Sequence, residues 1–452
     1  MRVLRWLGPL ALVVAALLLA DTVPHPLASS SAGGGLPPSV DFASAPSKDG
    51  EQFLPGEMLV KFKLPLPPGA VGVIHGLAGG AEMEYLPALG LHRIRLPDGV
   101  DAQQAATIYN ALPWVEYAEP NYIVRAAITP DDPLYPVDQA WYYDIINAPA
   151  GWDIERGRLA TIVAVLDTGA DLDHPDLESK IWTNGRETPG NGLDDDLNGC
   201  IDDVHGCNFV TLPPSNDPGD DHGHGSMIAG IVGADSNNGQ GVAGVAWGAT
   251  VLPVKVLDKT GTGSASDVAQ GIIYAAKSGA QVINLSMARP SPSRALEEAV
   301  KAAHNTYGAI LVAAAGNEGQ AAVGYPAAYP EVIAVAAFDH GDPNSRASFS
   351  NWGPQVNVAA PGVDVFSTHL NGGYARGQGT SFASAFASGL VALLLSQDSA
   401  RTDDDVRALL RISADDLPDG STPNWDGWGR LNLGGALNSR AYQAILPGLV
   451  KD

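Results

Sequence analysis

The chain has 452 residues, of which 45% are hydrophobic and 17% charged, which is enough apolar sequence for one large core and a smaller module. Its formal net charge of −24 excludes the class of proteins that bind the phosphate backbone of nucleic acids, because like charges repel. The composition therefore predicts a globular protein that binds no nucleic acid.

The amino-terminal segment carries Arg2 and Arg5 ahead of an apolar run that ends at Ala20. This order predicts a secretory signal peptide over residues 1–20, and so a secreted or cell-envelope-associated protein. The run is also nearly long enough to stay as an uncleaved membrane anchor. No later stretch reads as a membrane span, so we expect no stable membrane association once the signal is cleaved.

Residues 21–52 are rich in Ser, Ala, Gly and Pro, which is typical of a flexible linker. A β-α-β-β-α-β pattern follows within residues 53–127 and predicts a small α+β, ferredoxin-like domain. The predicted strands are 56–64, 81–86, 91–97 and 114–125, and the predicted helices are 70–78 and 102–112. The domain holds no cluster of catalytic residue types, so a folding or regulatory role suits it better than chemistry.

From residue 128 to residue 452, apolar strands alternate with helical stretches such as 267–279 and 293–305. Continuous apolar strands separated by helices predict an α/β, doubly wound, mostly parallel sheet with helices on both faces. The strands are 161–167, 250–257, 280–287, 309–316 and 332–338. Ligands bind at the carboxyl ends of such strands, which directs attention to Asp167, Ser286 and Asn317.

The stretch 379–384, Gly-Thr-Ser-Phe-Ala-Ser, opens a segment that is apolar all round and therefore predicts a buried helix. Ser381 lies at its amino end, where free N–H groups favour developing negative charge. Asp167 and His224 complete an Asp…His…Ser order that supplies a nucleophile, a base and a carboxylate to orient the base. Asn317 can donate a hydrogen bond to an oxyanion.

Each of these residues also has a simpler explanation. Ser381 alone could be a helix N-cap, Asp167 could cap the element that follows its strand, and Asn317 could form the turn before Gly319. His222 and His224 could bind a metal, but no third ligand follows at a familiar spacing. The GxSxG turn of α/β-hydrolases is absent, because residue 383 is Ala.

Several segments resemble the signature blocks of the subtilisin-like serine proteases, the subtilases of peptidase family S8, and they occur in family order between about Asp131 and Leu437. They are AVLDTGADLDHPDL, HGHGSMIAG, VLPVKVLDKTGTG, VINLSM, AAAGNEG, VGYPAAYPEVIAV, SFSNWGP, VNVAAPG and GTSFASA. Residues 54–126 resemble the family's inhibitory propeptide and end in its VEYAEPNY block. After the signal peptide at 1–20 and the linker at 21–52, the resemblance implies a propeptide at 53–127 and a subtilisin-like peptidase domain at 128–452.

By this resemblance Asp167, His224 and Ser381 form a catalytic triad, and Asn317 with the Ser381 N–H forms an oxyanion hole. The substrates are polypeptides, and the propeptide inhibits its own monomeric enzyme. The implied substrate-binding residues are Gly261, Thr262, Gly263, Ala265, Val268, Ser286, Met287, Ala288 and Gly324. The family usually has two glycines where Ala288 and Arg289 stand, so we expect a smaller primary pocket with a positive rim. Met227, Ala385 and Phe386 also depart from the family pattern, at positions that transfer no proton.

The resemblance implies one calcium site that combines Asp132, Asp176 and Asn238. A second Ca²⁺ is predicted from the acidic insertion, since residues 191–221 hold eight Asp and no Lys or Arg. Its expected ligands are Asp194, Asp196, Asn198, Asp202 and Asp203. Oxygen ligands suit calcium, although the spacing is not that of an EF-hand and a solvated acidic loop is the alternative.

The chain has two cysteines, Cys200 and Cys207, and export makes a disulfide between them the expected state. In relatives with this insertion the same positions resemble Tyr and Trp. A bond here would enclose Asp202 and Asp203 and hold them close together against their repulsion.

The sequence thus predicts an exported, calcium-stabilised serine endopeptidase made as a self-processing proenzyme. One alternative is a catalytically silent calcium-binding module on the same fold, which would have no physical need for four correctly placed polar groups. Another is a hydrolase of a different bond that uses the same triad. The glycine-rich edge at 261–263 and the propeptide disfavour that alternative, because both are suited to extended peptide.

Overall fold

The computed structural model describes residues 45–46, 52–64, 66, 68–77, 80–97, 99–123, 128–417 and 425–438. The chain divides into two compact units, one that contains residues 52–123 and one that contains residues 128–438. The predicted signal peptide and most of the predicted linker lie outside the described residues.

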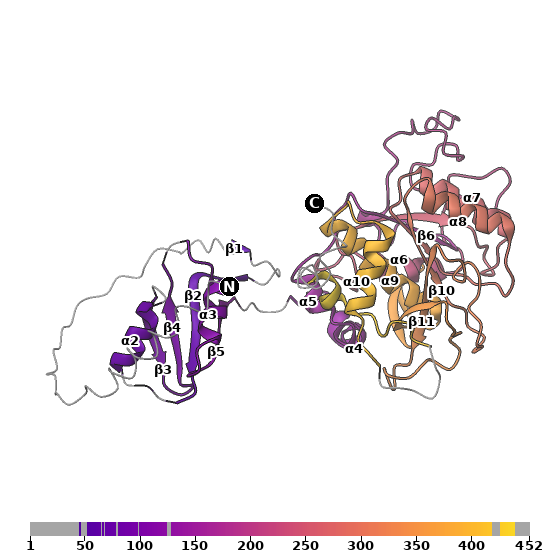
Figure 1. The fold of residues 1–452 in the computed structure, drawn as a ribbon. Helices are drawn as coiled ribbons and strands as arrows, with labels where there is room; N and C mark the ends of the chain where they lie inside the picture. The colour runs from indigo at the N-terminus through magenta and orange to yellow at the C-terminus, as the bar shows by residue number, and fades with distance from the viewer. Residues whose placement is uncertain are drawn as a thin grey trace. The chain divides into compact units, whose positions relative to one another are not determined.

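The amino-terminal unit has the predicted β-α-β-β-α-β order (Figure 1). Its central strand β2 pairs antiparallel with both β4 and β5, and β3 pairs with β4, so the sheet order β3-β4-β2-β5 confirms the ferredoxin-like arrangement. The elements are β2 (Gln52–Phe62), α2 (Pro68–Leu77), β3 (Ala81–Leu86), β4 (Leu91–Arg95), α3 (Ala102–Asn110) and β5 (Val115–Tyr122). The short strand β1 (Ala45–Pro46) also pairs with β2, so part of the stretch predicted as a linker joins this sheet.

The carboxy-terminal unit is built on a seven-stranded sheet in the order β12-β11-β10-β9-β6-β8-β7, in which every neighbouring pair is parallel. This confirms the predicted α/β class. The strands are β6 (Ile162–Asp167), β7 (Cys207–Asn208), β8 (Thr250–Lys255), β9 (Val282–Leu285), β10 (Ile310–Ala314), β11 (Val332–Phe338) and β12 (Val356–Pro361).

Helices cover both faces of this sheet because its strands are apolar on both sides. On one face α6 (His224–Gly233) and α9 (Thr380–Gln397) belong to one hydrophobic cluster. On the other face α7 (Ala265–Lys277) and α8 (Arg294–Asn305) belong to a second cluster and lie side by side (Figure 1). The remaining α-helices and strands of this unit are α4 (Ala140–Ile145), α5 (Ala148–Trp152), β13 (Val365–His369), β14 (Gly373–Gly377), α10 (Asp403–Ser413) and α11 (Leu433–Leu437).

The strand order places the switch point of the sheet at β6. After β6 the chain adds β8 on one side, and then β9 to β12 on the other side. Helices that leave neighbouring strands in opposite directions open a crevice at the carboxyl ends of those strands. Asp167, the last residue of β6, therefore stands where the topology favours a binding site.

The described part of the chain contains one helix, α9, that is long and apolar enough to cross a membrane. The prediction that no later stretch reads as a membrane span is wrong by this criterion. However, 94% of the qualifying window is buried inside the protein. The apolar sequence of α9 is accounted for by its position in the core, between the sheet and its neighbouring helices.

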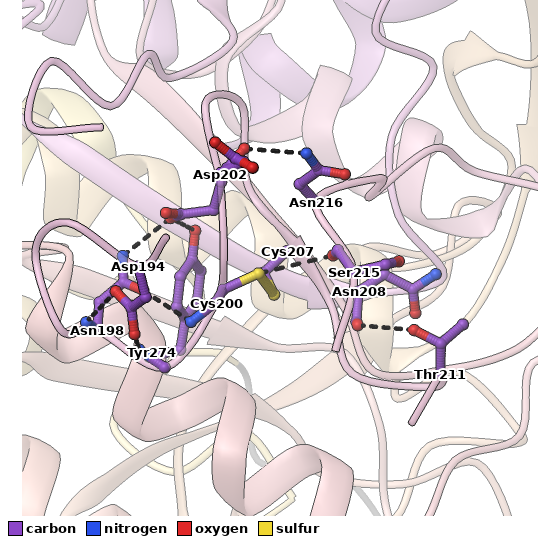
Figure 2. Close-up of a disulfide and its surroundings, with 12 residues drawn as sticks. Asp194, Asn198, Cys200, Asp202, Cys207, Asn208, Thr211, Ser215, Asn216 and Tyr274 are labelled. Atoms are coloured by element: carbon purple, nitrogen blue, oxygen red, sulfur yellow. Dashed lines mark hydrogen bonds between the residues drawn. A yellow bond between two sulfur atoms is a disulfide. The ribbon is translucent and has the colours of Figure 1, made fainter. Parts of the chain in front are cut away.

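The predicted disulfide between Cys200 and Cys207 is present, with the two Cα atoms 6.3 Å apart (Figure 2). Cys207 belongs to the edge strand β7, and both cysteines are buried in the cluster on the α7 face. The bond therefore fastens the acidic insertion to the edge of the parallel sheet. The loop folds back on itself between the two cysteines, as such a short bridge requires.

We expect replacement of both cysteines by alanine to lower the free energy of unfolding by about 2–3 kcal/mol, because closing so short a loop removes entropy from the unfolded chain. Alanine is chosen over serine because both positions are buried and a hydroxyl there would add its own cost. Thermal melting of the wild type and the double variant measures the difference. Two free thiols in the wild type, counted by mass spectrometry, would contradict the bond.

Candidate active site

The carboxylate of Asp167 and the ring of His224 form the centre of the site. Asp167 is fully buried, and its Oδ1 accepts hydrogen bonds from His224 Nδ1 and from the Thr168 N–H, each at 2.7 Å. His224 is the first residue of α6, so the end of a strand and the start of a helix meet here. Since Nδ1 donates to the carboxylate, Nε2 is the ring nitrogen left to accept a proton.

The surrounding charges set the basicity of His224. Burial of the ring lowers its pKa, but the charge of Asp167, the hydrogen bond that the ring donates to Asp167 and the charge of Asp220 raise the pKa by more. The net pKa of His224 is therefore above the ordinary histidine value. An imidazole with this support is suited to accept a proton from a neighbouring hydroxyl.

Ser381 is the second residue of α9, directly before Phe382. The adjacent Phe382 ring meets the His224 ring edge-on, with the centroids 5.8 Å apart. No hydrogen bond joins Ser381 to His224 among the described residues. Such contacts are often long before a substrate is bound.

Asn317 follows β10 and faces the start of α9. Its Oδ1 accepts hydrogen bonds from the N–H and the hydroxyl of Thr380, both at 2.9 Å, so its Nδ2 is free to donate elsewhere. A Cβ added to Gly379 would lie 3.5 Å from Asn317 Nδ2 and 3.7 Å from Ser381 Oγ. Asn317 Nδ2 and the Ser381 hydroxyl therefore both lie close to this position beside Gly379.

The loop that carries Asn317 is held by a residue whose role the sequence did not reveal. The Oδ1 of Asn351 accepts the N–H groups of Glu318 at 3.1 Å and Gln320 at 2.9 Å. The Nδ2 of Asn351 donates to Glu318 at 2.6 Å. Asn351 lies within the SFSNWGP block. That motif was the one feature of the sequence that could have drawn attention to Asn351.

The predicted peptide-binding edge at 261–263 lies beside the loop that carries His224. A Cβ added to Gly261 would be 3.5 Å from His222 Nε2, and one added to Gly263 would be 2.0 Å from the Val256 carbonyl oxygen. Only glycine fits the second position without a backbone shift. Two further residues predicted to bind substrate differ in exposure, since Val268 is buried in the α7 cluster and Ala265 is partly exposed.

The predicted primary pocket contains two segments that face each other. A Cβ added to Gly324 would lie 2.9 Å from the Ala288 methyl group, and the next residues, Arg289 and Tyr325, pair through their backbones. The Ala288 methyl thus occupies space that a glycine would leave open. The side chain of Ser286 does not face this pair of segments. Its buried hydroxyl accepts a hydrogen bond from Asn284 at 2.6 Å and lies 3.4 Å from the Ser381 carbonyl oxygen. Met287 is partly buried against the α7 cluster.

The three residues predicted for the first calcium site lie together. Asp132 and Asp176 are both buried, and Asn238 contacts both, through its N–H to Asp132 at 3.4 Å and through Nδ2 to Asp176 at 3.5 Å. Burial raises the pKa of Asp132 against the opposing effect of backbone N–H groups. Two buried carboxylates and an amide from three segments fit a hard cation that would neutralise their charge.

The acidic insertion is arranged differently from the predicted second site. Asp194 and Asp196 converge with Glu187, with potential ligand atoms all within 4.8 Å of one another. Glu187 Oε2 is buried and has no hydrogen-bond partner among the described residues. A buried carboxylate oxygen without a partner is costly, so the donor set fits a cation. Glu187 precedes the Asp-rich run and was not among the predicted ligands.

The other predicted ligands of this site make different contacts. Asp202 accepts the N–H groups of Asn191 and Gly192 at 3.1 and 3.0 Å, which holds the loop in shape. Asp203 accepts a 2.5 Å hydrogen bond from the hydroxyl of Tyr274 on α7, and Asn198 Nδ2 donates to it at 2.9 Å. Burial raises the pKa of Asp203 to about 6. Asp203 thus fastens the insertion to α7. Asn198 also donates its N–H to Asp194 and to Asp196, so it lies against the Glu187 cluster.

Comparison with known proteins extends over both units. Residues 159–429 match the Subtilase family, and residues 41–121 match the Fervidolysin N-terminal prodomain. A thermophilic serine proteinase of Bacillus sp. (strain AK1) is 41% identical over 72% of this chain and 73% of its own length. Thermitase of Thermoactinomyces vulgaris is 40% identical over 70% of this chain and 99% of its own length.

A solved structure shows the same relationship. A protease of Pseudoalteromonas arctica PAMC 21717 aligns with a TM-score of 0.60 and 30% identity, and the alignment covers 69% of this chain and all of that one. The family match spans more than half of the sequence and coincides with the parallel-sheet unit. The chain therefore belongs to the subtilase family of serine endopeptidases.

Proposed function

We propose that this subtilase is an exported, calcium-stabilised endopeptidase that hydrolyses polypeptides through Asp167, His224 and Ser381. The observation that carries the proposal is the 2.7 Å hydrogen bond between buried Asp167 and His224, beside the start of the helix that holds Ser381. A silent calcium-binding module with the same fold is disfavoured, because burying the charged carboxylate of Asp167 beside His224 is costly and such a module would gain nothing from it.

In the proposed reaction, Ser381 Oγ attacks the carbonyl carbon of the scissile peptide bond and His224 Nε2 takes its proton. Asp167 holds the imidazole in the required tautomer and stabilises its charged form. His224 then returns the proton to the leaving amine, and water hydrolyses the acyl-enzyme by the same route in reverse. Asn317 Nδ2 and the Ser381 N–H donate to the oxyanion that forms on the carbonyl oxygen.

Calcium would be held at two places. Asp132, Asp176 and Asn238 would bind one ion between the start of this unit and the loop after α6. Glu187, Asp194 and Asp196 would bind the other within the acidic insertion. At both places Ca²⁺ would supply positive charge and cross-links between loops, and it takes no part in the proton transfers.

The amino-terminal segments of the chain serve export and maturation. Residues 1–20 direct export, and residues 53–127 act as a propeptide that assists folding and inhibits the enzyme until the enzyme removes it. Support comes from the prodomain match at residues 41–121 and from the ferredoxin-like sheet. The mature enzyme is proposed to be a monomer with no membrane or nucleic-acid partner.

We expect Ser381→Ala to give a folded full-length precursor that does not mature. In the namesake of the family, loss of the nucleophile costs roughly 10⁶ in kcat, so no processing should be visible within hours. Amino-terminal sequencing of the wild type should place the cut within residues 122–129. Maturation of the purified Ser381→Ala precursor, with all other proteases excluded, would refute self-processing.

We expect Asn317→Ala to lower kcat by roughly 10²–10³, the cost of losing one oxyanion donor in the namesake of the family, with KM little changed. The bond is made mainly in the transition state, which is why kcat carries the loss. Thr380→Val is the matched control, because it removes a hydroxyl contact of Asn317 but leaves Nδ2 in place. A change confined to KM would mean that Asn317 only shapes the cleft.

We expect the mature enzyme to bind two Ca²⁺ ions and Glu187→Gln to bind one, since the first site is intact in that variant. Ions are counted by equilibrium dialysis, and melting temperatures are compared with and without a chelator. Asp217→Asn is the control, because Asp217 is an exposed aspartate of the same loop whose Oδ1 accepts only the Gly219 N–H. Equal ion counts in the wild type and Glu187→Gln would exclude this second site.

A further inference from the structure

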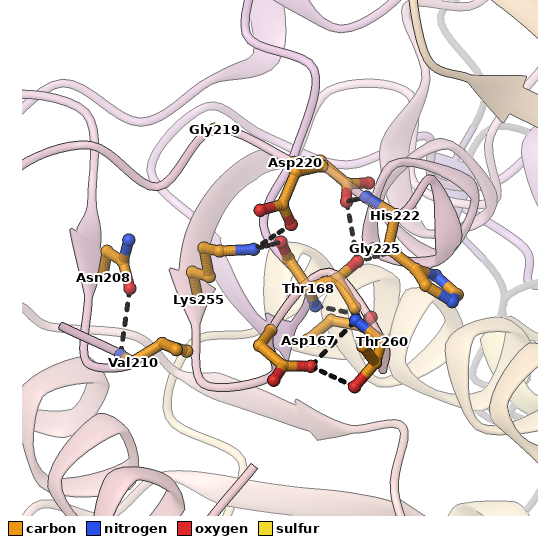
Figure 3. Close-up of polar contacts among 12 residues, drawn as sticks. Asp167, Thr168, Asn208, Val210, Gly219, Asp220, His222, Gly225, Lys255 and Thr260 are labelled. Atoms are coloured by element: carbon orange, nitrogen blue, oxygen red, sulfur yellow. Dashed lines mark hydrogen bonds and ion pairs between the residues drawn. The ribbon is translucent and has the colours of Figure 1, made fainter. Parts of the chain in front are cut away.

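Asp220, in the loop before α6, is engaged on both carboxylate oxygens. Its Oδ1 accepts hydrogen bonds from the Thr168 hydroxyl at 2.8 Å and from the N–H groups of His222 and Gly223 at 2.9 Å. Its Oδ2 accepts the N–H and the hydroxyl of Ser226 at 2.9 and 2.7 Å. Figure 3 shows Asp220 between the end of β6 and the start of α6.

These bonds cap the helix that begins at His224. The residue at the N-cap position is Gly223, which has no side chain to satisfy the free N–H groups of the first turn. Asp220 takes the N–H of Ser226, and the Thr168 hydroxyl takes the N–H of Gly225 at 2.9 Å. The backbone on both sides of His224 is therefore held by Asp220 and by its partner Thr168.

Thr168 joins this cap to the buried carboxylate of the site. Its N–H donates to the same Asp167 oxygen that accepts His224 Nδ1. Its carbonyl oxygen accepts a 2.6 Å bond from Lys255 Nζ, which is buried and also bonds Asp221 (Figure 3). Thr168 thus contacts the Asp167 carboxylate, the cap of α6 and the buried ammonium group of Lys255. The position of Thr168 therefore fixes Asp167 relative to the start of α6.

Asp220 also acts through its charge. Burial raises its pKa, but hydrogen bonds from Gly223, Ser226 and His222 lower the pKa by more, so the carboxyl group stays ionised. Its charge adds to that of Asp167 in raising the pKa of His224. The titratable and charged groups around His224 are Asp167 at the end of β6, Lys255 at the end of β8, His369 at the end of β13, and Asp220, Asp221 and His222 in its own loop.

We propose that Asp220 is a positioning residue of the active site, which fixes the start of α6 through Thr168 and supplies a second negative charge to the protonated ring of His224. This role rests on the proposed function of His224 as the general base. A carboxylate that served only to cap the helix would support folding, but it would not influence the pH at which His224 becomes active.

The test is the pH profile of Asp220→Asn, prepared by maturation of the full chain. Without the negative charge the imidazolium is less stable, so His224 loses its proton at lower pH. The acid limb of kcat/KM should therefore move to lower pH, by about 0.5 unit. The plateau of kcat should fall roughly tenfold to hundredfold, because the base is no longer held in place. Titration with a serine-directed inhibitor corrects for any inactive fraction.

Three further variants separate position from charge. Thr168→Val removes the hydroxyl but keeps the Asp220 charge, so kcat should fall while the acid limb stays in place. Thr168→Ser restores the hydroxyl and should recover most of the kcat. Asp217→Asn removes an exposed carboxylate of the same loop and should change neither quantity.

If the acid limb of Asp220→Asn does not move and only the fraction of folded enzyme falls, Asp220 is a structural cap and the proposal is wrong. If Asp220→Asn does not mature, Ser226→Ala tests the position alone, because it removes one hydrogen bond to Asp220 and keeps the charge. An unchanged kcat in both Ser226→Ala and Thr168→Val would then overturn the proposal. Failure of the proposed function would look different, since Ser381→Ala would retain its peptidase activity.

Discussion

The constraint on which the site depends is the burial of the Asp167 charge at the end of β6. An ionised carboxylate removed from water costs several kcal/mol unless it is paired and hydrogen-bonded. The described residues offer Oδ1 two donors, His224 and the Thr168 N–H, whereas Oδ2 is buried without a partner. The desolvation cost that these two hydrogen bonds leave uncompensated favours a positive charge on the His224 imidazole. Burial of the Asp167 carboxylate therefore also makes the His224 ring more basic.

The rest of the carboxy-terminal unit places partners around that charge. The parallel sheet brings the carboxyl ends of β6, β8 and β10 to one edge, and with them Asp167, Lys255 and the loop of Asn317. Helices α6 and α9 begin at the same edge and contribute His224 and Ser381 at their amino ends. Rigid elements of the core therefore hold each polar group, which is what precise positioning requires.

For the acidic insertion, composition predicted the kind of site but not its ligands. The excess of aspartate between residues 191 and 221 indicated a cation site, and the two cysteines indicated a bond, which is present. The spacing could not distinguish aspartates that converge on Glu187 from those that fasten the loop. Asp202 and Asp203 face backbone N–H groups and Tyr274 because the loop folds back at the disulfide, and that path is a property of the packed structure.

The sequence by itself determined the class of each unit and the order of its elements, because alternating apolar segments are local signals. Its short motifs also singled out Asp167, His224, Ser381 and Asn317 as the candidate site. The sequence also pointed to the two regions where calcium is proposed, without all of the ligands of the second site. Only the tertiary structure revealed Asn351, Glu187 and the bonds of Asp220 with Thr168, and only it placed Val268 in the core. Those contacts join residues distant in sequence, and their partners are set by the packing of strands and helices, which no local pattern encodes.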